Sequence, residues 1–255
     1  MKRKLHVSAV SFKGGRENNE DNFYVKKRRY PEIVTRDERY SYTTKGKNCC
    51  FAVADGMGGV QHGELASLAS IEYLSNHMRL LKKNPDNFFN KANSKVKKAC
   101  RTQGGTTFSC AVFDENKVKF YTIGDSPIYM YRFSEKELYQ INELDNAAAK
   151  MDKESVDPLE YQRAKCQLLA FLGCGRFKDK VPYHSYEVQA ESGDIIFLCT
   201  DGVDSVKPEE IKVLCETRAG NFASISEGIA ETAFCNATRF GDRADNVTVI
   251  TIEVE

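Results

Sequence analysis

The segment Phe51-Ala52-Val53-Ala54-Asp55-Gly56-Met57-Gly58-Gly59 places one carboxylate between an apolar run and a glycine-rich run. The uncharged run Cys49 to Ala54 predicts a short buried strand. The run Gly56 to Gly59 predicts a sharp turn, because glycine reaches backbone angles that other residues avoid. Asp55 would then lie where a buried strand ends. It could be a ligand for a cation or simply the residue that begins the turn, and this motif alone favours neither.

Around this segment the chain alternates between helical and extended patterns. Helices are predicted where apolar residues recur at helical spacing, over Glu64 to Leu81, Asn87 to Arg101, Pro208 to Cys215 and Phe222 to Thr238. Strands are predicted over His6 to Phe12, Asn22 to Val25, Thr106 to Phe113, Lys117 to Ile123, Pro127 to Phe133, Tyr183 to Gln189, Asp194 to Cys199 and Val247 to Val254. Short strands joined by tight turns pair antiparallel. With two early helices and two late ones, the pattern predicts an α+β layered sandwich, a two-sheet core covered by helices.

Two segments interrupt this rhythm. Lys26 to Lys47 is basic and rich in tyrosine, and it predicts a hairpin or a surface loop. Glu143 to Arg176 is polar, with a helical pattern around Pro158 to Leu172. No internal repeat and no linker rich in proline, glycine or serine divides the sequence, so residues 1–255 are expected to form a single domain.

Composition narrows the function. Hydrophobic residues make up 41% and charged residues 29%, which is typical of a soluble globular protein, and the formal charge of +1 gives no case for general nucleic-acid binding. No apolar run is long enough for a signal peptide or a membrane span, so we expect a cytoplasmic protein without a membrane partner. The nine cysteines form no Cys-x-x-Cys pair, which indicates reduced thiols. The four histidines do not cluster, so carboxylates are the better candidates for metal ligands.

Two further aspartates share the setting of Asp55. Asp201-Gly202 follows the apolar run Ile195 to Thr200, and Asp245 lies just before the last predicted strand. Carboxylates at strand ends, with carbonyls freed by glycine turns, suit hard cations such as Mg²⁺ or Mn²⁺. Any single Asp-Gly pair is more often a hairpin turn. Three such positions beside buried strands favour a metal site.

Seven segments together resemble the metal-dependent protein serine/threonine phosphatases, the PPM or type 2C family. They occur in the family's order over nearly the whole chain, as Arg16-Glu-Asn-Asn-Glu20-Asp21, Val53-Ala-Asp55-Gly-Met-Gly-Gly59, Gly104-Gly-Thr-Thr107, Gly124-Asp125-Ser126, Leu172-Gly173, Leu198-Cys-Thr-Asp201-Gly202 and Asp245-Asn246-Val-Thr-Val249. Each segment is weak alone, but seven in order are specific. The resemblance implies a four-layer α-β-β-α sandwich, in which two antiparallel sheets are flanked by helices.

The resemblance also implies a role for each matching position. Asp55 would bridge two metal ions, Mn²⁺ or Mg²⁺, and the Gly56 carbonyl would bind one of them. Asp201 and Asp245 would complete the other site. Glu20 and Asp21 would hold metal-bound waters, and Asp125 would contribute to a third, weaker metal site. Arg16 would bind the substrate phosphate as a bidentate fork.

The family's reaction is hydrolysis of phosphoserine and phosphothreonine by a water that two metal ions activate. No covalent phosphoenzyme is needed, so the cysteines are expected to be small core residues rather than nucleophiles. Implied partners are phosphoprotein substrates of a serine/threonine kinase, and the expected state is a monomer.

The sequence departs from the family at a few positions. Many eukaryotic members carry a histidine where Met57 stands, and bacterial-type members often carry one at the position of Val60. Met57 cannot protonate a leaving group and is bacterial-like, while His62 is better explained as a residue that begins a helix. The segment of about 143–176 corresponds to the family's variable flap beside the active site.

Two other functions stay open. A pseudophosphatase that acts as a binding module would need a broken metal set, and Asp55, Asp201 and Asp245 are all present. A hydrolase of small phosphate esters would use the same metal core. Runs of basic residues usually form a solvated surface, and a docking patch for an acidic partner is the less common alternative. Such runs occur at Lys26 to Arg29 and at the lysines 82, 83, 91, 95, 97 and 98.

Overall fold

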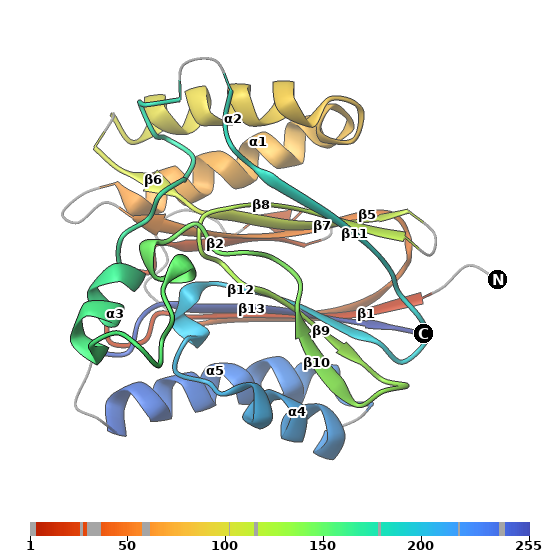
Figure 1. The fold of residues 1–255 in the computed structure, drawn as a ribbon. Coiled ribbons are helices and arrows are strands. Elements are labelled where there is room, and N and C mark those ends of the chain that lie inside the picture. Colours follow the sequence, from red (N-terminus) through yellow and green to blue (C-terminus); the bar gives the residue numbers. More distant parts are fainter. Residues whose placement is uncertain are drawn as a thin grey trace.

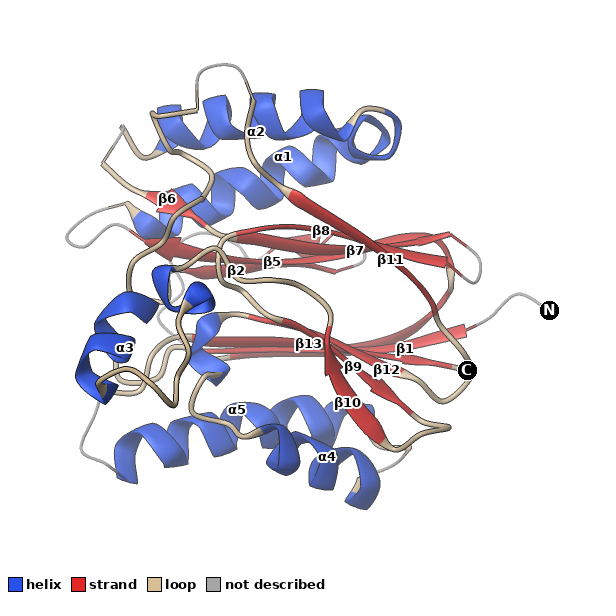
Figure 2. Ribbon diagram, in the orientation of Figure 1, coloured by secondary structure: helices blue, strands red, loops and turns tan. Residues whose placement is uncertain are grey.

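The protein is a sandwich of two antiparallel sheets between two layers of helices (Figures 1 and 2). The structure, a computed structural model, describes residues 4–25, 28–29, 37–57, 62–101, 103–114, 117–177, 180–218, 220–239 and 243–255. Its helices are α1 (Gly63–Lys83), α2 (Pro85–Ala99), α3 (Pro158–Lys165), α4 (Pro208–Thr217) and α5 (Phe222–Arg239), with short 3-10 turns η1 (Ala147–Lys150) and η2 (Asp201–Val203). The predicted α+β fold class is thus confirmed.

The strands are shared between two sheets. The first sheet runs in the order β10 (Glu137–Gln140), β9 (Ile128–Arg132), β12 (Ile195–Cys199), β13 (Val247–Val254), β1 (Lys4–Phe12) and β4 (Glu38–Lys45). The second runs β11 (His184–Gln189), β8 (Lys117–Ile123), β7 (Phe108–Asp114), β5 (Lys47–Met57), β2 (Asp21–Val25) and β3 (Arg28–Arg29), and β6 (Gly105–Thr106) pairs with β5. Helices α1 and α2 cover the second sheet, and α4 and α5 cover the first (Figure 1).

Strand β5 shows why the central run carries no charge. Phe51 and Val53 point into the core between the two sheets, where Phe51 packs edge-on against Phe113 at 5.7 Å between ring centroids. Ala52 and Ala54 point the other way, into the core beneath α1 and α2. Because both faces are buried, every position must be apolar, and the small alanines leave room for the helices.

Most predicted elements are present within a few residues of their predicted limits. Helix α2 begins earlier than Asn87, because the side chain of Asn84 accepts a hydrogen bond from the Asn87 backbone N–H at 3.0 Å and Pro85 takes the first helical position. The helical pattern predicted up to Leu172 ends at Lys165 instead, and the residues after it pair with other segments.

Strands β4 and β10 and the two-residue strand β3 were not predicted as strands, and one turn was misplaced. Residues Glu38–Lys45, predicted as part of a hairpin or loop, form β4, an edge strand that pairs with β1 and keeps one face in solvent, which explains its polar sequence. Strand β10 is likewise a short, mostly exposed edge strand. Strand β5 continues through Gly56 and Met57, which pair with Thr106 and Gly105, so the predicted turn does not begin at Gly56. Gly58, Gly59 and Val60 lie outside the described residues.

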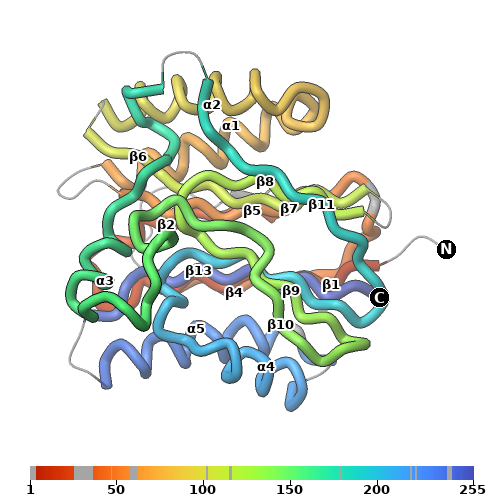
Figure 3. Tube along the Cα trace, in the orientation of Figure 1, coloured from red at the N-terminus to blue at the C-terminus, as the bar shows by residue number. Residues whose placement is uncertain are grey.

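The strand registers define two ends of the sandwich. Phe12 of β1 lies opposite Val247 of β13 at one end, and Leu5 lies opposite Val254 at the other, near the C-terminus (Figure 3). The described parts of the motif loops lie at the Phe12 end (Figure 1). Within the described part of the chain, no helix is both long enough and apolar enough to cross a membrane.

Candidate active site

Acidic residues from both sheets meet at the Phe12 end of the sandwich. Asp21 and Asp55 lie directly opposite each other where β2 pairs with β5 in the second sheet. Asp201 follows β12, and Asp245 precedes β13, in the first sheet. Asp125 lies in the turn between β8 and β9. The fold therefore brings the carboxylates predicted from separate motifs to one place.

Asp21 joins the two sheets. It is 2% exposed, and its Oδ2 accepts hydrogen bonds from the hydroxyls of Thr200 at 2.8 Å and Thr248 at 2.7 Å. Its Oδ1 is buried without any hydrogen-bond partner. Burial raises the pKa of Asp21 to about 7, against the opposing effect of the two hydroxyls. An unpartnered buried carboxylate oxygen costs about 1–3 kcal/mol, so it marks a position where a polar ligand would be stabilising.

Asp55 and Asp201 form a second pair of acids. Both are half-buried, and their carboxyl groups hydrogen bond to one another. Burial raises the pKa of both, and the negative charge of neighbouring acids, Asp201 on Asp55 and Asp125 on Asp201, raises it further. A hydrogen bond between two carboxyl groups requires a proton on one of them, which agrees with the raised pKa of both. Two acids this close share a proton unless a cation balances their charge.

Asp125 lies at the edge of this group, where the flap segment meets the sandwich. Burial raises its pKa to about 6, although a hydrogen bond from Asn146 Nδ2 at 3.3 Å opposes the shift. The neighbouring Gly124 N–H donates to Asp145 Oδ2 at 2.9 Å. Lys165 of α3 pairs with Asp204, just beyond Asp201. The segment predicted as a flap therefore contacts both the Asp125 turn and the Asp201 turn.

Gly56 and Gly63 are packed too tightly for any side chain. A Cβ on Gly56 would lie 2.1 Å from the Gly63 carbonyl oxygen, and one on Gly63 would lie 2.6 Å from the Glu20 carboxyl carbon. The Gly56 N–H donates to the Glu20 carbonyl at 3.2 Å, and the Ser67 hydroxyl donates to the same carbonyl at 2.6 Å. Burial, and then the charge of Glu64, raises the pKa of Glu20. The start of α1 thus holds the Glu20 segment against the end of β5.

Arg16 is 51% exposed at its side chain, and its Nη2 lies 2.6 Å from Asp245 Oδ2. That hydrogen bond raises the pKa of Arg16. The loop is held by Asn246, whose Nδ2 donates to the carbonyls of Lys13 at 2.7 Å and Asn18 at 3.0 Å, and whose Oδ1 accepts from the Glu20 N–H at 2.8 Å. The guanidinium predicted to bind phosphate therefore points at the carboxylate group, with part of its fork open to solvent.

The residues fit hard divalent cations in their donor chemistry. Among the described residues, no three His, Cys, Asp or Glu side chains already surround one point as a finished metal cluster. The donors that converge are carboxylate oxygens, the ligands that Mg²⁺ and Mn²⁺ prefer. Asp21 Oδ1 lacks a partner, and Asp55 shares a proton with Asp201. A cation would satisfy both.

Several supporting residues were not assigned a role from the sequence. Thr200, Thr248 and Asn246 lie inside the motifs, but their partners are far away along the chain. Thr106 Oγ1 donates to the Asp55 carbonyl at 2.9 Å, and the Asp55 N–H donates to Thr107 Oγ1 at 2.9 Å. The sequence feature that could have identified such supporting residues is a polar side chain at the end of an apolar strand. His62 occupies the N-cap position of α1 with φ 86°, which agrees with its predicted place at a helix start.

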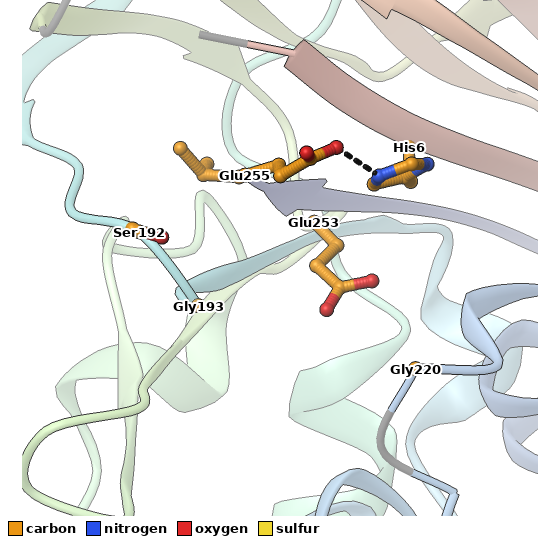
Figure 4. A pocket seen from close by; sticks show the side chains of 7 residues that line it. His6, Ser192, Gly193, Gly220, Glu253 and Glu255 are labelled. Carbon is orange, nitrogen blue, oxygen red and sulfur yellow. Dashed lines mark hydrogen bonds and ion pairs between the residues drawn. The ribbon is translucent and has the colours of Figure 1, made fainter.

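A shallow pocket of about 240 Å³ lies at the opposite end of the sandwich, lined by His6, Ser192, Gly193, Gly220, Glu253, Val254 and Glu255 (Figure 4). Glu255 there pairs with His6 at 2.8 Å and with Lys4 at 3.0 Å. These charged groups are already paired. The pocket therefore offers less for catalysis than the carboxylate cluster.

Comparison with known proteins identifies relatives of the whole sandwich. Residues 45–255 match the family described as Stage II sporulation protein E (SpoIIE). A serine/threonine phosphatase stp of Listeria innocua is 25% identical over 228 residues, covering 83% of this chain and 87% of that protein. The catalytic domain of the serine/threonine protein phosphatase PstP, solved with two manganese ions, is 26% identical, with a TM-score of 0.71 over 98% of this chain and 99% of that one. A serine/threonine phosphatase of S. agalactiae shares the fold, with a TM-score of 0.76 at 18% identity over 98% of this chain and all of that one.

Proposed function

Since the chain belongs to the SpoIIE family and is a PPM-type protein serine/threonine phosphatase of bacterial type, we propose that it hydrolyses phosphoserine and phosphothreonine in proteins with two Mn²⁺ or Mg²⁺ ions. Asp55, the Gly56 carbonyl, Asp201 and Asp245 would hold the ions, and Glu20 and Asp21 would hold their waters. When bound, such ions lower the pKa of a water to supply the nucleophile and offset negative charge on the phosphate oxygens.

The chain's own residues supply position and charge. Thr200 and Thr248 fix Asp21 through its Oδ2, which leaves the buried Oδ1 free to hold a metal-bound water. Arg16 binds the phosphate through the part of its fork that Asp245 leaves open, since a planar guanidinium matches two phosphate oxygens at once. Asn246 holds the loop that carries both Arg16 and Glu20. No cysteine of the described chain takes part in this scheme.

One observation carries the proposal, the meeting of Asp21, Asp55, Asp125 and Asp201 at one end of the sandwich with every pKa raised. Such crowding of acids is costly in a merely structural role, because burial and like charge both penalise ionisation. Perturbed carboxyls of this kind concentrate at functional sites. We assign Asp125 to a third, weaker cation at the flap.

The test is an assay of metal-stripped protein on a phosphothreonine peptide, with Mn²⁺ and Mg²⁺ restored separately. Activity should be lost on stripping and should return with either ion or with one of them. Metal-restored protein that binds the phosphopeptide without cleaving it would indicate a pseudophosphatase. Faster cleavage of sugar phosphates than of phosphopeptides would indicate a small-ester hydrolase.

The proposal also covers the domain organisation, the oligomeric state and the cellular location of the enzyme. Residues 1–255 form one phosphatase domain with a flap over about 143–176, acting as a monomer in the cytoplasm on phosphoproteins made by a serine/threonine kinase. Three hydrophobic cores that share strands support one domain, because β5 contributes to two of them and β12 and β13 contribute to two. The mass of the protein in solution would test whether it is a monomer. The location of a tagged chain in the cell would test whether it acts in the cytoplasm.

A further inference from the structure

Positive charge is concentrated on one helical layer. Residues 63–101, which span α1 and α2, contain eight Lys and Arg residues and three acids, for a formal charge of +5, and all eight basic residues lie within 79–101, whereas the whole chain carries +1. Residues 207–239, which span α4 and α5 on the opposite face, contain four basic and five acidic residues. The two helical layers cover opposite faces of the sandwich (Figure 1). An excess of positive charge on only one of them is therefore not a general property of the protein's surface.

The exposed face of α2 carries a stripe of lysines that form no ion pair with the described residues. Lys91, Lys95 and Lys98 are all exposed and follow one another at spacings of four and three residues, so they lie on one side of the helix. No acidic side chain in the described parts of the chain forms an ion pair with any of the three. The one acid of the helix, Asp86, accepts from the Tyr183 hydroxyl at 2.9 Å and lies 3.5 Å from Lys180 Nζ.

This stripe works against the stability of its own helix. Like charges at these spacings destabilise a helix, where alternating signs would stabilise it. Lysines in the last turn, such as Lys98, are favoured by the helix dipole, but Lys91 and Lys95 lie too far from the C-terminus to benefit. A simple solvated face would not need three lysines without any acid between them. The charge pattern therefore suits an anionic partner.

The C-terminal half of α2 is linked to the active site through the end of the flap segment. Asn93 Oδ1 accepts from the Gly173 N–H at 2.7 Å, and Lys97 Nζ lies 3.5 Å from the position of a Cβ on Gly175, so this half of α2 packs on the end of the flap segment. Leu172 in that segment exchanges two backbone hydrogen bonds of 2.9 Å with Thr106, whose hydroxyl donates to the Asp55 carbonyl. Arg176, which follows Gly175 in the chain, is also exposed.

We propose that the stripe Lys91, Lys95 and Lys98 binds an acidic stretch of the phosphoprotein substrate that flanks the phosphorylated residue. The inference rests on the proposed function and adds a substrate class to it, phosphoproteins with acidic residues near the phosphosite. Surface charge of this kind acts through attraction before contact, so it raises the rate of productive encounter and is weakened by salt.

The experiment compares two phosphothreonine peptides that differ only in a flanking run of glutamates or glutamines. We expect Lys95→Gln/Lys98→Gln to lower kcat/KM for the acidic peptide by about fivefold at low salt, mainly through KM, with little change for the glutamine peptide or p-nitrophenyl phosphate. Glutamine keeps the helix propensity of lysine, so the fold is preserved. The matched control, Lys136→Gln/Lys207→Gln, removes two exposed charges far from α2 and should change neither peptide.

A separate binding measurement distinguishes this inference from the proposed function. Fluorescence anisotropy of a non-phosphorylated glutamate-rich peptide should show tighter binding to the wild-type protein than to the α2 variant, whether or not the protein hydrolyses anything. Wild-type protein that cleaves both phosphopeptides equally well would overturn the acidic-substrate assignment and leave the phosphatase intact. Equal binding of the probe by wild-type protein and variant, or tighter binding of a duplex DNA of equal charge, would also overturn it.

Discussion

The two ends of the sandwich treat carboxylates in opposite ways. At the Phe12 end, Asp21, Asp55 and Asp201 are buried or half-buried beside one another, and their pKa values are raised. At the other end, Glu255 is exposed beside Lys4 and His6, and hydrogen bonds from those two residues lower its pKa. The first arrangement destabilises the charged form of the acids, and the second stabilises it. Acids held at a cost in the metal-free protein indicate selection for something other than stability.

The largest effect on turnover should come from removing a charged carboxylate at the Phe12 end. Asp55→Asn and Asp201→Asn should each lower turnover on a phosphothreonine peptide to below about one-thousandth of wild type at saturating metal, because both the cations and the charge on the nucleophile depend on these groups. The metal-free variants should melt no earlier than wild type, since each change relieves like-charge repulsion. Turnover, metal content and thermal melts on the same preparation provide the measurement. Near wild-type turnover in either variant would refute the site.

Asp125 should have a smaller and more specific effect. Asp125→Ala should reduce turnover by about tenfold or more while the two tightly held ions remain bound, because it removes a ligand of the weaker site only. The dependence of its activity on Mn²⁺ concentration should also change. If Asp125 were a turn residue alone, the variant would lose about 1 kcal/mol of stability and keep full activity per folded molecule. Metal counting with turnover separates these outcomes.

The free energy of unfolding of the metal-free protein should depend on pH in a direction set by the acids at the Phe12 end. An aspartate has a pKa near 3.9 when unfolded, and Asp21 reaches about 7 in the folded protein, so the folded state binds the proton more tightly between these values. The contribution is full below about pH 4 and is lost as pH rises through about 7, by about 4 kcal/mol. Chemical denaturation of metal-free protein across this range is the measurement. Added Mn²⁺ should stabilise more at high pH than at low pH, and Asp21→Asn should flatten the metal-free profile.

The smallest effect is expected at the opposite end. The lowered pKa of Glu255 contributes stability above its unfolded pKa that is lost as pH falls, the reverse of Asp21, but its solvent exposure leaves little of it. Glu255→Gln should leave turnover and metal binding unchanged and shift the melting temperature only slightly. It is therefore the matched charge-removal control for Asp55→Asn. A loss of activity in Glu255→Gln would show that the two ends are not independent.

Local pattern was sufficient for most of the architecture. The apolar run of β5, the helical spacing in α1 and the strand–turn signals from β7 to β9 each depend on a few neighbouring residues, so the sequence alone predicted two antiparallel sheets with helices. It failed at β4 and β10, because a polar edge strand with one face in solvent resembles a loop. The seven motifs in order also identified the carboxylates that the fold brings together.

Tertiary structure alone decided how those carboxylates are held. Asp21 meets Thr248 across 227 positions of sequence, and Arg16 meets Asp245 across 229, so no local pattern could pair them. The same is true of the raised pKa values, which arise from burial between two sheets and from charges on other elements. Sequence determined which residues are acidic and which strands are buried. The stacking of the sheets determined which acids face one another, because burial and proximity are properties of the packed chain and not of any segment.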